Sequence, residues 1–205
     1  MWFYKNRLLI ILLLVVFVMV GCKEQPVKEE GFKLPSEESI ALKLGENYSF
    51  TLEFNGNEIS YKTKYIVTEA GYYVEYESDD EKEEDYAYLY LLSNEQLYYG
   101  SKYLLNKKSD SDLFDLGNGL DYLAFFADTA AEEETTGFVG GRECVKYVIK
   151  ETSLYSFSCY IDKETGACLR CVARSSNDYY EWTVKDFVIG GQDLTEQIMK
   201  INVEK

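Results

Sequence analysis

The sequence contains no histidine. This absence excludes a Ser-His-Asp triad, a Cys-His nucleophile pair and any histidine-ligated metal centre. Paired carboxylates could still serve as acid and base, but no pair stands in a recognisable motif, and 36 acidic residues produce such pairs by chance. A glycine-rich phosphate loop is also missing, because Gly140-Gly141 and Gly190-Gly191 fall at the ends of expected strands. We therefore expect a protein that is not an enzyme, with no catalytic residues and no cofactor.

Positive charge is also scarce. The chain has 21 basic and 36 acidic residues, which gives a formal net charge of −15. Such a surface repels nucleic acid and anionic lipid head groups, so no nucleic-acid partner is expected. The acidic runs 79–85 and 132–134 are interpreted as solvated loops. Asp110-Ser111-Asp112 begins a calcium-loop spacing, but Phe114 stands where a third ligand belongs, so we predict no metal site.

One unbroken apolar run, Leu8–Val20, follows the positive charges of Lys5 and Arg7. As a helix this run is roughly 20 Å long, whereas the hydrocarbon core of a membrane is about 30 Å thick. Length and flanks therefore favour a cleaved signal peptide over a permanent membrane span. The alternative is an uncleaved anchor helix with an incidental cysteine after it.

The residues that follow, Met19-Val20-Gly21-Cys22, resemble the lipobox of bacterial lipoproteins, although Met19 replaces the usual leucine. In that family the cysteine thiol takes a diacylglyceryl group, and a dedicated peptidase cuts before the cysteine. The resemblance implies a signal peptide at 1–21, cleavage between Gly21 and Cys22, and lipidation of Cys22. It also implies an extracytoplasmic protein that is anchored to the cell membrane by its lipid, since two acyl chains are enough for stable anchoring.

Beyond the lipobox the composition changes abruptly to polar residues, so we predict a flexible tether over 22–38. The remaining residues, 39–205, are enough for one domain with a real core, and no repeat or linker divides them.

Alternating apolar and polar residues predict a domain built mainly of strands, rich in tyrosine. The spacing of apolar residues over 110–128 is closer to helical, although Gly117 and Gly119 interrupt it, and a loop of small and acidic residues should lead from there to Gly137. A short helical turn is expected over 193–198. The predicted strands are 48–54, 58–69, 72–77, 86–92, 97–102, 143–150, 154–161, 167–175 and 179–189.

Two segments of the last third resemble a known family. These are Gly141-Arg142-Glu143-Cys144-Val145-Lys146-Tyr147 and Tyr160-Ile161-Asp162-Lys163-Glu164-Thr165-Gly166, the second followed by Cys168-Leu169-Arg170. They are similar to the C-terminal half of the lipoprotein-carrier-like superfamily of LolA, LolB and LppX types, with Arg170 in place of the more usual lysine. The resemblance implies a mainly β (α+β) fold: a curved antiparallel sheet, or open half-barrel, with a short helical insertion on its concave side. Several members hold a lipid or hydrophobic ligand there.

Four further cysteines, Cys144, Cys159, Cys168 and Cys171, form an even set in a domain expected to be exported, so disulfides are predicted. Side chains alternate between the two faces of a strand, which favours the pairs Cys144–Cys168 and Cys159–Cys171. In a plain meander the first pair would lie two strands apart, about 9.5 Å, beyond the reach of a disulfide unless the sheet is distorted. A four-cysteine zinc site and a redox-active Cys168-Leu169-Arg170-Cys171 are the lesser alternatives.

Two function classes follow. The first is a non-enzymatic, membrane-anchored lipoprotein that binds a lipid or another hydrophobic small molecule on the concave face of its sheet. The second is a structural or protein-interaction lipoprotein of the cell envelope without a small-molecule pocket. A large apolar cavity under the helical segment favours the first class, and a concavity filled by side chains favours the second. The sequence identifies neither the ligand-binding residues nor a protein partner.

The lipobox interpretation is tested by Cys22→Ser. Because only the thiol forms the thioether to the diacylglyceryl group, we expect the variant to stay unprocessed and to take up no label from a fatty-acid probe in the producing cell. Wild-type size and labelling in the variant would contradict the lipoprotein assignment.

Overall fold

The computed structural model describes residues 32–80, 83–108, 117–151 and 155–202. The predicted signal peptide, Cys22 and the tether as far as residue 31 lie outside the described residues. No helix among the described residues has the length and apolar character needed to cross a membrane.

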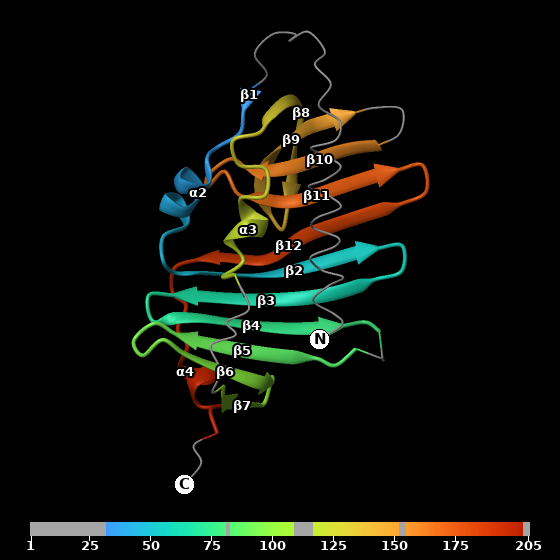
Figure 1. The fold of residues 1–205 in the computed structure, drawn as a ribbon. Coiled ribbons are helices and arrows are strands. Elements are labelled where there is room, and N and C mark those ends of the chain that lie inside the picture. Colours follow the sequence, from blue (N-terminus) through green and yellow to red (C-terminus); the bar gives the residue numbers. More distant parts are fainter. Residues whose placement is uncertain (1–31, 81–82, 109–116, 152–154, 203–205) are drawn as a thin grey trace. The chain divides into compact units, whose positions relative to one another are not determined.

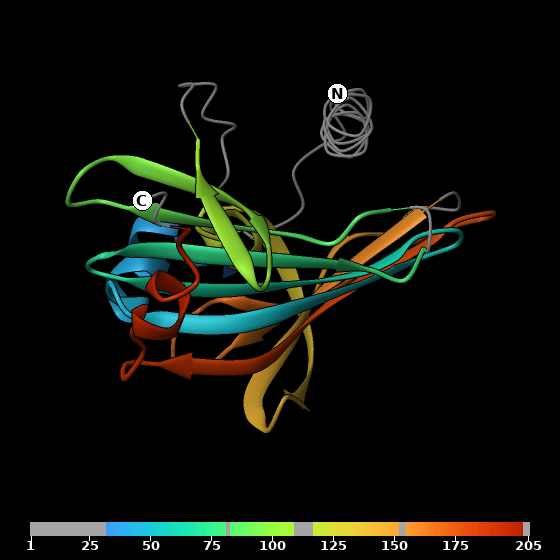
Figure 2. The same cartoon turned by 90° about the horizontal axis from the view of Figure 1, so that it is seen from below.

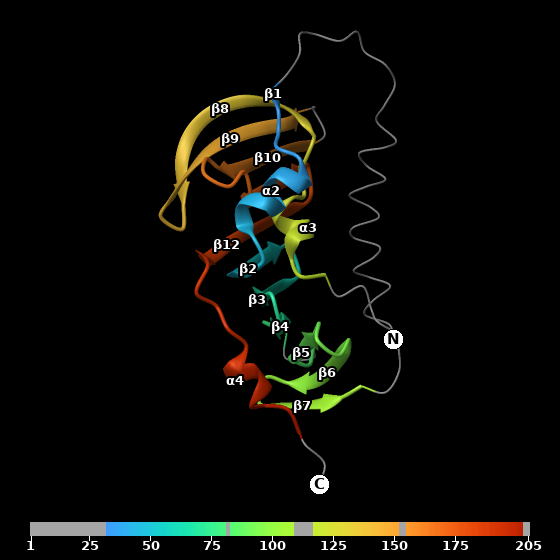
Figure 3. The ribbon, with the colours of Figure 1, turned by 90° about the vertical axis from the view of Figure 1, so that its left-hand side faces the viewer.

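The domain is one antiparallel sheet of twelve strands in the order β1-β8-β9-β10-β11-β12-β2-β3-β4-β5-β6-β7. The sheet curves but does not close, and the helices α2 and α3 lie on its concave side (Figures 1 and 3). This confirms the predicted mainly β open half-barrel. The strands are β1 (Phe32–Lys33), β2 (Tyr48–Gly56), β3 (Ser60–Thr68), β4 (Gly71–Ser78), β5 (Tyr86–Leu91), β6 (Gln96–Ser101), β7 (Leu104–Lys107), β8 (Ala130–Val139), β9 (Arg142–Glu151), β10 (Tyr155–Asp162), β11 (Cys168–Ser175) and β12 (Tyr179–Ile189).

Alternation explains the strands that the sequence predicted, β2 to β6 and β9 to β12. In β2 the side chains of Tyr48, Phe50 and Leu52 are buried, and the residues between them are partly exposed. This period of two places every second side chain on the concave face. The strand ends at Asn55-Gly56-Asn57, where the chain turns back into β3.

The expectation of a loop before Gly137 is wrong, because residues 130–139 form β8. The strand pairs with β9 from Glu132 opposite Val148 to Val139 opposite Arg142, and the predicted solvated loop 132–134 is part of it. Its composition hides this pairing, since acidic and small residues are poor strand formers. Beyond its short pairing with β1, β8 is the edge of the sheet, and charge on an edge strand discourages pairing with other chains.

The folded domain begins earlier than residue 39. Phe32 and Lys33 pair with β8, and helix α2 (Glu37–Leu44) starts within the range assigned to the tether. The Oγ of Ser36 accepts a hydrogen bond from the backbone N–H of Ser39 at 3.2 Å, which caps the helix. Its buried side chains, Ile40 and Leu44, join the concave core.

The other helices are single turns. α3 (Leu120–Leu123) is all that the described residues contain of the helix predicted for 110–128; residues 109–116 of that range lie outside them. α4 (Thr195–Ile198) confirms the predicted C-terminal turn. Leu194, just before α4, packs on the opposite face of the sheet in a second, smaller core with Ile66, Tyr73 and Leu89.

Gly119 is required for the chain before α3 to lie close to the sheet. Its φ of 82° lies in the left-handed region, and a Cβ there would stand 2.6 Å from Phe50 Cζ and 2.8 Å from Tyr65 Cδ1. The rings of Phe50 and Tyr65 stack at 4.7 Å, so neither can move away without leaving the other. The absence of a side chain at Gly119 allows the chain to approach the sheet here.

Gly119→Ala should therefore destabilise the protein by about 3 kcal/mol, because left-handed strain and overpacking each cost roughly 1–3 kcal/mol. Gly141→Ala is the matched control: its φ is also 82°, but a Cβ there meets nothing within 4 Å. The control should lose only about 1 kcal/mol, the backbone part. Equal losses in chemical denaturation would show that the close approach at Gly119 is not a constraint.

Candidate functional site: the concave face of the sheet

The part of the concave face under α3 is filled by side chains. Leu123 is fully buried, and Phe126 stacks on Trp182 with ring centroids 6.3 Å apart. Phe125 meets the same indole edge-on at 5.0 Å. Packing of this kind fills the space between Leu123, Phe125, Phe126 and Trp182 with side chains. A filled concavity is the feature that favours the second of the two function classes. The packing under α3 therefore favours a protein-interaction role over an enclosed small-molecule pocket.

Two hollows formed by described residues lie elsewhere. One, of about 640 Å³, is open and mixed in character, and the other, of about 240 Å³, is smaller. Neither is lined by α3. The first is lined by Lys43, Arg142, Glu164, Thr165, Phe187, Val188 and Ile189, and the second by Ser49, Phe50, Thr51, Lys64, Tyr65 and Asp186.

The Asp162 turn, which carries the family resemblance, is a structural node. Asp162 is buried, and its carboxylate accepts hydrogen bonds from Arg142 Nε and Nη2, each at 2.9 Å. It also accepts from the N–H and the Oγ1 hydroxyl of Thr165, at 2.9 and 2.6 Å. Burial by itself raises the pKa of Asp162, but these donors outweigh it and lower the pKa below its usual value. The motif therefore fixes the β10–β11 turn against β9, and all of its donors and acceptors serve that purpose.

Away from the helices, six aromatic rings cross the concave face in one row, each on a different neighbouring strand. Successive ring centroids are 4.8 to 6.2 Å apart, and several of the ring pairs are stacked. Cross-strand pairs of this type stabilise a sheet and make its surface rigid. We call this row the aromatic ladder; its members, in the order β12, β2, β3, β4, β5, β6, are Tyr180, Phe54, Tyr61, Tyr76, Tyr86 and Tyr99.

The aromatic ladder lies near strand ends that extend beyond α2 and α3 (Figure 2). Its two terminal rings are the most accessible: Tyr180 is 36% and Tyr99 is 45% exposed. Of the rings between them, Tyr76 is buried, and Phe54, Tyr61 and Tyr86 are partly buried. The sheet therefore carries a row of aromatic rings, exposed at its two ends, where no described helix covers it.

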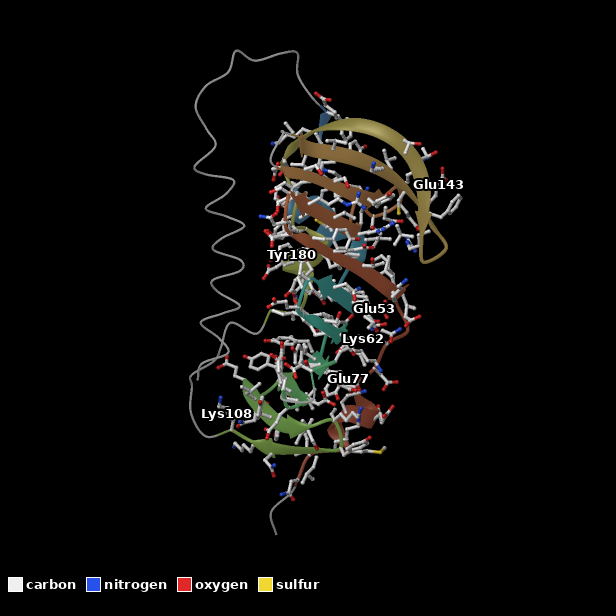
Figure 4. All side chains as sticks on the ribbon, turned by 90° about the vertical axis from the view of Figure 1, so that its right-hand side faces the viewer. Glu53, Lys62, Glu77, Lys108, Glu143 and Tyr180 are labelled. Atoms are coloured by element: carbon white, nitrogen blue, oxygen red, sulfur yellow. The ribbon has the colours of Figure 1, made fainter. Side chains whose placement is uncertain are left out.

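The convex face behind the ladder has the opposite character. Glu53 pairs with Lys62 at 3.8 Å, and Glu77 pairs with Lys102 at 2.5 Å. Figure 4 shows Glu53, Lys62 and Glu77 on one side of the sheet and Tyr180 on the other. The same strand ends therefore carry an ordinary charged surface on one face and aromatic rings on the other.

The four domain cysteines are buried free thiols in the structure. Cys159 of β10 stands directly opposite Cys171 of β11. Opposite residues of an antiparallel pair have Cα atoms about 4.5–5.5 Å apart, which a disulfide can span. A bulge after Tyr160 places Cys168 opposite Ile161, which moves Cys168 to the same face as Cys159 and Cys171. The alternation that favoured the pair Cys144–Cys168 therefore does not hold at Cys168, because the bulge adds a residue and reverses it.

Cys144 stands apart from these three. It lies opposite Asp162 on the other side of β10, so the pairing Cys144–Cys168 has lost its basis in strand parity. Burial, together with the charge of Asp162, raises the pKa of the Cys144 thiol to about 11. Burial and the neighbouring Cys159 also raise the pKa of Cys168, so these thiols are not activated nucleophiles. The described residues contain no acidic or cysteine cluster suited to a metal ion.

The sequence missed the aromatic ladder as a candidate site, although its residues were visible. The sequence predicts strands rich in tyrosine, a residue that suits half-buried sheet positions with one edge in water. The missing information is the register, because only the pairing of β12 with β2 and of β2 with β3 aligns Tyr180, Phe54 and Tyr61.

Comparison with known proteins concerns the fold. No family model and no curated protein matches the sequence. Similar solved structures include the MucA/MucB complex of Pseudomonas aeruginosa (12% identity, TM-score 0.45), LprF of Mycobacterium bovis (10%, 0.42) and the lipoprotein LppX of Mycobacterium tuberculosis (10%, 0.36). The three matches cover 78%, 77% and 76% of this chain, in the same order. They cover 58%, 98% and 95% of the matched chains. This chain therefore spans less than two thirds of the chain matched in the MucA/MucB complex. LppX, one of the types named by the sequence resemblance, is among these structures.

The disulfide expectation now becomes a sharper prediction. In protein isolated under oxidising conditions, Cys159 and Cys171 should be bridged, so that thiol titration after unfolding without reductant finds two of the four domain thiols. Peptide mapping should join the β10 and β11 peptides. Four free thiols would contradict the bridge, and a Cys144–Cys168 peptide would contradict the register.

Proposed function

We propose that the protein is a non-catalytic binding protein of the cell envelope, held at the membrane by a lipid on Cys22, which engages a protein partner through the aromatic ladder. The observation that carries this proposal is a six-ring row on a part of the concave face that lies beyond the described helices α2 and α3. Tyrosine is well suited to such a surface, because a rigid ring and a hydroxyl group provide contact area with little loss of conformational entropy.

We prefer binding at the surface to an enclosed lipid because the region near α3 and the region of the aromatic ladder differ in packing. Near α3, the rings of Phe126 and Trp182 stack on each other and fill the space. In the aromatic ladder the rings pack side by side, and the two terminal rings, Tyr99 and Tyr180, are the most exposed of the six. Exposed aromatic side chains of this kind are suited to contact with another protein.

The anchor adds a geometric reason for this role. Fourteen residues, 23–36, lie between Cys22 and the start of α2 at Glu37, and of these only 23–31 precede the sheet. A lipidated N-terminus would therefore keep the domain within tens of ångströms of the membrane surface. Such tethering raises the effective concentration of the binding face toward other envelope proteins.

Site-specific photo-cross-linking in the native cell tests the proposal. A photoreactive phenylalanine analogue at Tyr99 or Tyr180 should give a discrete protein adduct, because both side chains stand at the ends of the ladder. The same analogue at Ile198, which is 43% exposed on α4, is the matched control and should give none. No adduct from either ladder position, or equal adducts from Ile198, would contradict the proposed binding face; adducts only to lipid would replace the protein partner with a lipid.

A further inference from the structure

Building on the proposed function, we propose that the partner of the aromatic ladder is an extended polypeptide segment rich in lysine or arginine. Three features of the described residues point to this chemistry: a group of carboxylates beside the ladder, a lysine of this chain placed on one of its rings, and the length of the row.

The carboxylates lie in the connection between β4 and β5. Glu83, Glu84 and Asp85 follow one another directly, and Glu83 Oε2 accepts a hydrogen bond from the Tyr76 hydroxyl at 2.7 Å. The charge of Glu84 reaches Tyr99, since burial first and then Tyr86 and Glu84 raise the pKa of that phenol. The carboxylates therefore adjoin the ladder at its β4, β5 and β6 rings. We call these three residues the acidic rim.

The acidic rim carries three carboxylates that no described lysine or arginine neutralises. Among the described residues, no lysine or arginine forms an ion pair with Glu83, Glu84 or Asp85. On the convex face, by contrast, Glu53 and Glu77 each have a lysine partner. A partner with positive charge would be attracted to the rim at long range and then paired there.

The ladder already receives one cation from its own chain. The Lys108 ammonium lies 5.8 Å from the ring centroid of Tyr99, the terminal ring, within the range of a cation–π contact. Figure 4 shows Lys108 on the same side of the sheet as Tyr180. The chemistry inferred for the partner is thus used once within the domain, at one end of the row.

The length of the row fits a short extended segment. Six strands at a spacing of about 4.8 Å give a row of roughly 24 Å between its terminal rings, which an extended chain covers with about seven residues. Alternate side chains of such a segment point to one face, so basic residues could meet the rim while apolar ones meet the ring edges. The net charge of −15 disfavours an anionic lipid surface or nucleic acid as the occupant.

The test uses the full chain in detergent micelles and fluorescent heptapeptides in which valine alternates with lysine, glutamate or serine. The lysine peptide should bind, and its affinity should fall as salt rises from about 0.05 to about 0.5 M. Neutralising the rim by Glu83→Gln, Glu84→Gln and Asp85→Asn together should weaken binding about tenfold. Tyr99→Leu with Tyr180→Leu should weaken it about fivefold, as expected for the loss of ring contacts.

The matched control removes three carboxylates elsewhere: Glu53→Gln, Glu69→Gln and Glu77→Gln lower the net negative charge equally and should leave the affinity within twofold. Equal binding of the serine or glutamate peptide, or an equal effect of rim and control variants, would overturn the inference. So would ladder-dependent binding to phosphatidylglycerol vesicles, which would assign the face to lipid. If the lysine peptide fails while Tyr99 still cross-links to a protein in cells, the binding face stands and only the basic partner is rejected.

Discussion

The pairing of β2 with β12 joins the two ends of the domain, and the other features depend on it. Tyr48 lies opposite Ile189 and Gly56 opposite Tyr180, so a strand from the start of the domain runs along one from its end. Without this contact the chain would form two smaller sheets, β2 to β7 and β8 to β12, each with an open edge in the middle of the concave core. Closing so long a loop costs entropy before any contact compensates for it, and the burial of Leu52 and Val184 at this seam offsets that cost.

The same seam divides the concave face into two parts with different uses. Near the helices, Trp182 of β12 and Phe126 fill the space between sheet and chain, which gives the fold its core. Further along the same two strands, Tyr180 and Phe54 continue the aromatic ladder into the other half of the sheet, with centroids 6.2 Å apart. The core and the proposed binding face are therefore one continuous apolar surface, and the helices decide where the first ends and the second begins.

The motifs that drew attention in the sequence serve the fold rather than the binding face. Asp162 and Thr165 hold the β10–β11 turn, and Arg142 fastens that turn to β9 by two hydrogen bonds of 2.9 Å. A buried carboxylate with this many donors is specific in geometry, which explains why the pattern is recognisable at all. The residues that we assign to binding are surface tyrosines and acidic residues, which form no pattern along the chain.

The sequence by itself determined the class of the fold, most of the strands and the turns between them, because the alternation seen at Tyr48, Phe50 and Leu52 is a local signal. It also contains Met19-Val20-Gly21-Cys22, whose resemblance to a lipobox is read along the chain. Tertiary structure alone decided that the acidic segment 130–139 is a strand, that a bulge turns Cys168 inward, and that six rings on six strands stand in one row. Each of these depends on register between segments that are distant in sequence. A shift of one residue in that register moves every side chain to the opposite face, and no local pattern specifies it.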